Sequence, residues 1–152
     1  MPAPAMAGCA DAPAPGVNWQ RCNFDRRHFD DVDLTGANLR DASFSSATLA
    51  HAKLQRVDGR RARFVAAKLA GARFDGAQLA AADFTSADLT AASLSKVDAR
   101  RARFFGAKLN DADLTGARLE GADLFNADLS GALWVDGKLR CAPGSIGSCN
   151  PN

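Results

Sequence analysis

The stretch that decides the fold is residues 102–139, ARFFGAKLNDADLTGARLEGADLFNADLSGALWVDGKL. Every fifth residue in it is large and apolar: Phe104, Leu109, Leu114, Leu119, Leu124, Leu129, Trp134 and Leu139. A small residue, Ala or finally Gly, precedes each of them by two positions. A period of five fits neither the 3.6-residue period of a helix nor the two-residue period of a strand. A fixed period of this kind predicts a repeat architecture.

The period also constrains the path of the chain. We call each large residue a centre, and the same register runs from Trp19 to Leu139 with only Gly59 and Ala99 as small centres. A centre and its small partner two positions earlier point to the same side of an extended segment. The two residues between units must then turn a corner. Four corners close a square coil of about 20 residues that pairs with its neighbours in parallel; three corners per coil are the alternative geometry.

The sequence contains a test of the square coil. If a coil has four units, residues 20 positions apart stack directly, and one column of centres is then entirely Phe. The members of this expected core ladder are Phe24, Phe44, Phe64, Phe84 and Phe104. A three-unit coil would scatter these residues, so the column favours four corners.

Six units of the chain read ADLTG, ARLEG, ADLFN, ADLSG, ANLRD and AQLAA. They closely resemble the A-[DN]-L-x-x motif of the pentapeptide repeat family, and the resemblance covers residues 17–141. It implies an all-β fold, the right-handed quadrilateral parallel β-helix, here with about six coils of four pentapeptides. Stacked at the usual strand spacing, six coils would form a rod of roughly 29 Å. The family is defined by its fold, so the resemblance carries no activity with it.

The register divides the chain into three parts. We expect an extended, Pro- and Ala-rich N-terminal segment at 1–16, the β-helix at 17–141, and a C-terminal cap or tail at 142–152. Residues 1–16 have neither a basic start nor an apolar run, so we expect no intact signal peptide in this chain. The segment is compatible with the remnant that follows removal of such a peptide.

The four cysteines lie at the two expected ends of the rod, Cys9 and Cys22 at one and Cys141 and Cys149 at the other. A disulfide needs Cα atoms within about 7 Å. Bridges along the rod are therefore excluded, which leaves Cys9–Cys22 and Cys141–Cys149, or free thiols as the alternative. Because both ends carry the same arrangement, we favour disulfides and thus a periplasmic or secreted protein of bacterial origin.

Two similar basic segments are candidates for a partner-binding site. Arg60, Arg61 and Arg63 recur 40 residues later as Arg100, Arg101 and Arg103, which is two coils further on the same face. Arginine forks with acidic neighbours are suited to an anionic polymer or an acidic protein surface. The alternative is a solvated, salt-bridged face that was duplicated with its block of sequence.

A second candidate contact is aromatic. Phe105 and Phe125 each follow a centre directly, so they should point outward and stack in adjacent coils. Outward aromatic residues are typical of contact surfaces. The alternative is that they cover a neighbouring corner of the same chain.

Nothing else in the sequence indicates chemistry. The two histidines are isolated, the cysteines lack metal-ligand spacing, and no stretch is long and apolar enough to span a membrane; we expect no enzyme activity, cofactor, metal or small-molecule substrate. Net charge is +2, which makes DNA binding improbable. We expect a monomer or homodimer that acts as a structural or protein-binding module with an unknown protein partner.

The resemblance also implies an alternative function. Some members of the pentapeptide repeat family mimic DNA, bind gyrase and confer quinolone resistance. That role requires an acidic rod, whereas the outward positions of this chain carry both signs of charge.

Overall fold

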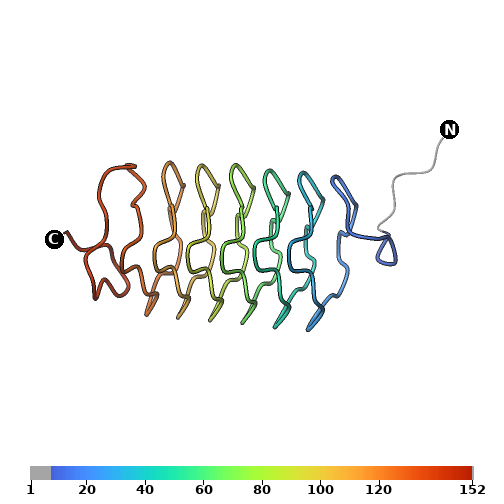
Figure 1. The fold of residues 1–152 in the computed structure, drawn as a ribbon, viewed down its shortest axis with the longest axis horizontal. Coiled ribbons are helices and arrows are strands. Elements are labelled where there is room, and N and C mark those ends of the chain that lie inside the picture. The colour runs from blue at the N-terminus through green and yellow to red at the C-terminus, as the bar shows by residue number, and fades with distance from the viewer. Residues whose placement is uncertain (1–7, 152) are drawn as a thin grey trace.

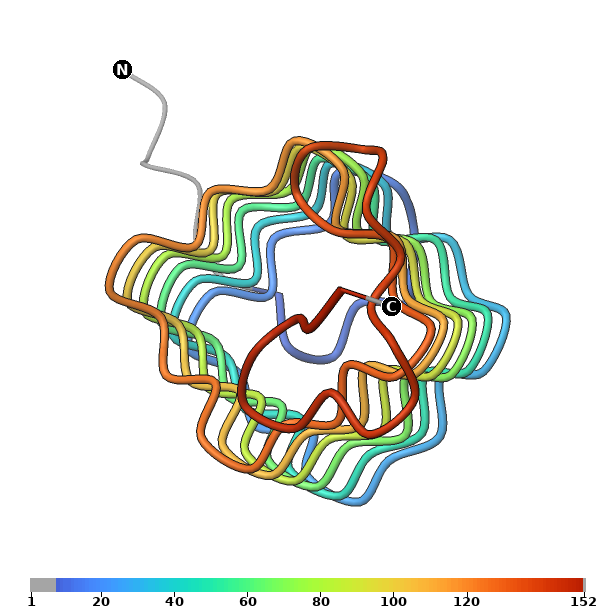
Figure 2. The ribbon, with the colours of Figure 1, turned by 90° about the vertical axis from the view of Figure 1, so that its left-hand side faces the viewer.

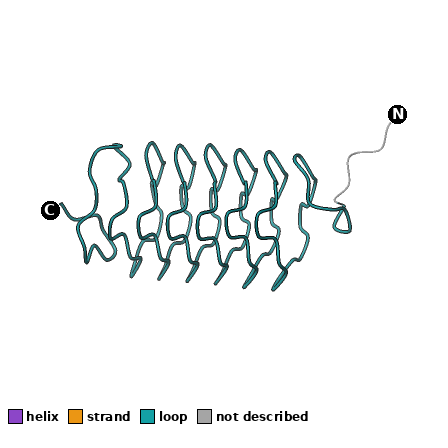
Figure 3. Ribbon diagram, viewed as in Figure 1, coloured by secondary structure: helices purple, strands orange, loops and turns teal. Residues whose placement is uncertain are grey.

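The computed structural model describes residues 8–151, which form an elongated β-helix solenoid (Figure 1). The residue before each centre forms a parallel β-bridge with the residue 20 positions later, from Asn18↔Asn38 to Asp113↔Leu133. Successive bridges are five residues apart, so four of them complete each turn, and the end-on view has a four-cornered outline (Figure 2). Within 8–151 the structure contains no helix and no strand longer than a single bridge residue (Figure 3).

Tight turns explain why the pairing is so short. At each corner the amide three residues after the centre bonds back to the centre's carbonyl, as from Cys22 N to Trp19 O at 3.1 Å. The second corner residue has a positive φ at every unit from Gly16 to Gly131, as type II turns require. Many of these positions hold residues other than glycine, such as Ala81 and Arg101, although this region disfavours a Cβ. The regular hydrogen bonding of the stack evidently outweighs that cost.

The core is a column of centres and their small partners. In the Phe ladder, the ring centroids of Phe44 and Phe64 are 5.3 Å apart, those of Phe64 and Phe84 are 5.0 Å apart, and those of Phe84 and Phe104 are 5.1 Å apart. These rings are nearly parallel and fully buried. The 20-residue register inferred from the sequence is thus the register of the structure.

The two small centres are filled by their neighbours. A Cβ at Gly59 would lie 2.9 Å from Leu79 Cδ2, so the wall has no room for a larger centre there. Val57 and Val97, which replace the usual alanine two positions earlier, are buried and take up the volume that Gly59 and Ala99 leave.

The N-terminal end is closed by side chains of the first coil and by a short segment that crosses it. Cys9 is disulfide-bonded to Cys22, and Gly8 N donates to Asn18 O at 2.8 Å. Trp19 is 1% exposed, and its indole Nε1 donates to Asp11 O. Residues 1–7 of the predicted extended segment, and residue 152 of the predicted tail, lie outside the described residues.

The register prediction is wrong at its last centre, Leu139. The parallel ladder ends at Leu133, and the chain turns back to form an antiparallel bridge between Leu133 and Arg140. Here the positive φ moves from the second corner residue to Gly137, and Asp136 Oδ1 accepts bonds from Lys138 N and Leu139 N at 2.9 Å. This Asx turn redirects the chain.

One residue explains why another regular coil does not form. Pro143 would occupy a position whose N–H must bond to the coil below, as Asp123 N bonds to Ala102 O, and proline has no N–H.

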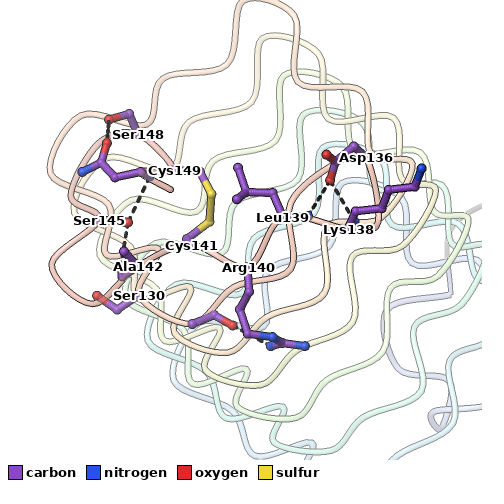
Figure 4. Close-up of a disulfide and its surroundings, with 12 residues drawn as sticks. Ser130, Asp136, Lys138, Leu139, Arg140, Cys141, Ala142, Ser145, Ser148 and Cys149 are labelled. Atoms are coloured by element: carbon purple, nitrogen blue, oxygen red, sulfur yellow. Dashed lines mark hydrogen bonds between the residues drawn. A yellow bond between two sulfur atoms is a disulfide. The ribbon is translucent and has the colours of Figure 1, made fainter. Parts of the chain in front are cut away.

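The remaining residues form a cap stapled by the Cys141–Cys149 disulfide (Figure 4). Ser145 is fully buried, and its hydroxyl donates to Ala142 O at 2.7 Å and accepts from Asn150 N at 3.1 Å. Both cysteine pairs are the ones that the sequence predicts. Each one fastens an irregular terminal segment to the end of the solenoid.

Candidate functional site

The arginine rows border a shallow groove at one corner column of the solenoid. Its volume is about 450 Å³, and its floor consists of Ala80 and Ala81, which lie one coil above Arg60 and Arg61 and one coil below Arg100 and Arg101. Small corner residues between two arginine rows therefore create the depression. Gln78 and Asp98 complete its lining.

Most of the arginine charge in this groove is compensated locally. Arg60 binds Asp58 with two hydrogen bonds of 2.9 and 2.8 Å, and Arg100 binds Asp98 in the same way at 2.8 and 2.7 Å. Arg61 reaches one coil down to Asp41, with bonds of 2.8 and 3.1 Å. Only Arg101 of the four has no carboxylate within 4.0 Å among the described residues.

These pairs hold the carboxylates ionised. The hydrogen bond from Arg61 lowers the pKa of Asp41, and that from Arg100 lowers the pKa of Asp98. Burial of Asp58 raises its pKa, but hydrogen bonds from Arg60 outweigh burial and the net pKa is lowered. The groove is consequently a paired, hydrated surface with limited surplus positive charge, which agrees with the salt-bridged alternative.

The structure separates Arg63 and Arg103 from this groove. They are bridge residues of the next face, in the ladder Ser43, Arg63, Asp83, Arg103 and Asp123. The interpretation that each row of three arginines projects from one face is therefore wrong. The first two arginines of each row are the corner residues themselves, and the third lies on the face that follows the corner.

The predicted aromatic pair is exposed and stacked. Phe105 is 40% exposed and Phe125 is 62% exposed, with ring centroids 5.6 Å apart. The third large apolar side chain that is exposed in the described part of the chain, Ile146, comes from the cap. Its neighbour Gly147 donates its amide to Ala127 O at 2.8 Å, two residues after Phe125, so Ile146 adjoins the same corner. We call Phe105, Phe125 and Ile146 the apolar corner.

The outward aspartates serve the fold. Asp83, Asp88 and Asp128 each accept the amide two residues later at 3.0 Å, together with the Thr or Ser hydroxyl there. His28 Nδ1 contacts Thr48 Oγ1 at 3.1 Å, and His51 lies beside Gly71. No cluster of three or more potential metal ligands, and no helix able to cross a bilayer, occurs within residues 8–151.

Sequence reasoning missed two features of this surface. Ile146 joins the apolar corner only because the cap folds back over the last coil, and the sequence fixes no register for the cap. The second feature is the end of the parallel ladder at Leu133, for which Pro143 in a donor position is a signal in the sequence.

Comparison with known proteins agrees with the repeat. The family model for pentapeptide repeats matches the chain in eight copies, within residues 16–133. No protein with a curated description matches it.

Several solved structures share the fold. HetL, a pentapeptide repeat protein involved in heterocyst differentiation regulation in the cyanobacterium Nostoc sp. strain PCC 7120, is 30% identical with a TM-score of 0.53. The match covers 81% of this chain and 64% of HetL, so the chain spans less than two thirds of that protein.

Rfr23 from the cyanobacterium Cyanothece 51142 is 20% identical over 77% of this chain and 90% of its own, with a TM-score of 0.64. QnrB1, a plasmid-mediated fluoroquinolone resistance protein, is 19% identical over 78% of this chain and 66% of its own, with a TM-score of 0.53. At these identities the two likenesses concern the fold.

Proposed function

The chain belongs to the pentapeptide repeat family, and we propose that it is a non-enzymatic protein-binding module that presents an outer surface of its β-helix to a partner protein. The observation that carries this proposal is the apolar corner, where two stacked rings with exposed fractions of 40% and 62% stand out from an otherwise polar surface. Clusters of exposed aromatic residues are typical of contact surfaces, because leaving such large apolar side chains in water does not stabilise the fold of the free protein.

We further propose an oxidising location, the bacterial periplasm or the exterior of the cell. Two disulfides, one at each end of the solenoid, support it, because disulfides persist where thiols are not kept reduced. For the fold itself, we infer the right-handed winding and about six coils of four pentapeptides that the family likeness implies. The 20-residue bridge spacing from Asn18 to Leu133 supports this.

The test of binding is capture of partners from a periplasmic extract by the immobilised protein. The double variant Phe105→Ser/Phe125→Ser should lose the captured partner, while Val65→Ser, in the same column two coils earlier, should retain it. Equal capture by wild type and the double variant would remove the apolar corner from the proposal.

A second set of variants separates the groove from the corner. Changing Arg60, Arg61, Arg100 and Arg101 together to Ser should leave capture and its salt dependence unchanged, because three of these four arginines are already paired. A large loss, stronger at low salt, would instead assign the partner to the groove.

A further inference from the structure

We propose that the uncovered rim of the last coil, residues 117–124, binds an extended segment of a partner protein as one additional parallel coil segment. This inference rests on the proposed protein-binding function and names a specific kind of partner. The last coil comprises residues 114–133, and Figure 2 shows the C-terminal segment crossing only part of it.

The covered part of the rim is paired with the cap. Leu129 N donates to Ser145 O at 2.8 Å, Gly131 N donates to Cys141 O at 2.9 Å, and Gly147 N donates to Ala127 O at 2.8 Å. The cap therefore satisfies the rim from residue 127 onward.

The uncovered part has no such partners. One coil below, the amides of Ala99, Arg101 and Phe104 donate upward, and the carbonyls of Val97 and Ala102 accept from above. The equivalent groups in the last coil are the amides of Leu119, Gly121 and Leu124 and the carbonyls of Ala117 and Ala122. None of these five has a hydrogen-bond partner among residues 8–151. A row of such groups is a template for another strand.

Apolar side chains lie just inside this rim. Leu119, Ala122 and Leu124 are only partly buried, whereas the centres one coil below, Ala99 and Phe104, are at most 1% exposed. An added segment would gain by covering them. The rim thus offers both backbone bonds and apolar area.

Charge specifies the partner and its register. The last pair in each of the two outward ladders of this rim is oppositely charged, with Asp98 below Arg118 and Arg103 below Asp123. The next residue over Arg118 should be acidic, and the one over Asp123, five positions later, should be basic. The predicted segment has the pattern small, acidic, apolar, two variable residues, small, basic, apolar. The chain's own residues 137–144 present Lys138 and Pro143 at the two charged positions, so they do not fit.

The experiment uses the intact, disulfide-bonded protein and two blocked peptides, AELTGAKL and its charge-swapped control AKLTGAEL. Wild-type protein should bind the first about tenfold more tightly, because two opposed pairs become like-charged in the control. The protein variant Arg118→Glu/Asp123→Lys should reverse this preference. Circular dichroism of the variant checks that the fold is retained.

Equal binding of the two peptides, no binding of either, or no reversal in the double variant would each overturn the proposal. Sedimentation that shows a dimer able to exclude the peptide would assign the rim to a second copy of this chain and overturn it as well. The capture experiment separates this proposal from the proposed function. Suppose that the Phe105→Ser/Phe125→Ser variant loses a periplasmic partner that the wild-type protein captures, while the Arg118→Glu/Asp123→Lys variant still captures it. The rim proposal then fails, and the proposed protein-binding function stands.

Discussion

The two ends of this solenoid close the same kind of core in different ways. At the N-terminal end, Trp19 is 1% exposed and packs on Phe24 and Phe29 with centroid distances of 4.3 and 5.4 Å. Arg27 lies over both Phe rings, with its guanidinium carbon 5.8 and 5.9 Å from their centroids. At the C-terminal end the cover is backbone paired to one part of the rim, and Leu119 and Leu124 stay partly exposed.

The difference shows what each type of closure can achieve. At the N-terminal end, large side chains fill the core from inside and a disulfide-bonded segment crosses it, so the aromatic residues of the first coil are buried although some backbone amides of its rim stay unpaired within the described chain. A paired cap protects only the part of the rim it bonds to, so it leaves backbone groups and apolar area accessible. The first-coil aromatic residues are therefore buried at the N-terminal end, whereas apolar side chains at the C-terminal rim stay partly exposed.

The largest expected effect is at the tryptophan of each end. Trp19→Ala should lower the free energy of unfolding by about 3–5 kcal/mol, because it empties a buried site among aromatic rings. Trp134→Ala, at a partly buried centre, should cost about 2 kcal/mol. Denaturant unfolding measures both, with the fully buried Phe64→Ala as a mid-solenoid reference expected to match Trp19→Ala. Equal losses of unfolding free energy in Trp19→Ala and Trp134→Ala would contradict the proposed difference between the two ends.

The disulfides should matter less than the buried tryptophan. They close short rings, with sequence separations of 13 and 8 residues, so removal of either by Cys→Ala pairs should cost about 2–3 kcal/mol. Loss of Cys141–Cys149 should also speed hydrogen exchange at Leu129 and Gly131, whose amides bond to the cap.

An intact-mass measurement comes first in this test. Native protein should weigh less than its reduced form by four hydrogen atoms, two for each bridge. Four thiols that react with an alkylating agent without prior reduction would remove the bridges and with them the argument for an oxidising compartment.

How far the sequence predicts this molecule follows from the same residues. The solenoid and its 20-residue register are predictable because every coil packs its core in the same way. The all-Phe column from Phe24 to Phe104 identifies the number of residues per coil. The structure of the two ends is harder to predict, since packing there depends on individual residues that do not recur in the repeat. The reversal after Trp134 follows from where one positive φ lies, at Gly137 instead of residue 136, and the five-residue pattern does not encode that shift.

The candidate site was also predictable only in part from the sequence. The exposure and stacking of Phe105 and Phe125 follow from register alone. The local pairing of Arg60 with Asp58, and of Arg61 with Asp41 in the coil below, depends on rotamers that a repeat pattern leaves open. The sequence leaves open whether these arginines bind a partner or form a salt-bridged face, and the observed pairs favour the salt-bridged face.

Acid should weaken the protein, in part through aspartates of its last coil and C-terminal hairpin. Hydrogen bonds from Leu139 N and Lys138 N lower the pKa of Asp136, and bonds from Ser130 and Asn110 lower that of Asp128. A carboxylate whose folded pKa is depressed contributes stability above its unfolded pKa, and this contribution is lost as pH falls through the folded value. Stability should thus stay level from neutral pH to about pH 5 and decline below about pH 4.

The matched control for the acid response is Asp136→Asn. Asparagine keeps the side-chain oxygen that accepts hydrogen bonds from the two amides, but this side chain does not titrate. The protection of the Leu139 amide from hydrogen exchange should therefore become less dependent on pH. Stability that rises on acidification would contradict the sign derived from these lowered pKa values.

The smallest expected effect is none at all, in a gyrase supercoiling assay. A rod that imitates DNA must present carboxylates along its sides in the manner of phosphates. The sides of this solenoid carry both signs of charge, as in the ladder of Arg63, Asp83, Arg103 and Asp123, and the whole chain carries a net charge of +2. Supercoiling should therefore be unaffected at micromolar protein.

The variant Arg63→Glu/Arg103→Glu makes that ladder acidic and sharpens the test. Inhibition by the variant alone would show that the shape of the solenoid is suitable for DNA mimicry and that its charge prevents it. Inhibition by wild-type protein would mean that contacts at the sides matter more than the two ends compared above, and would favour the DNA-mimic function over a protein-binding module.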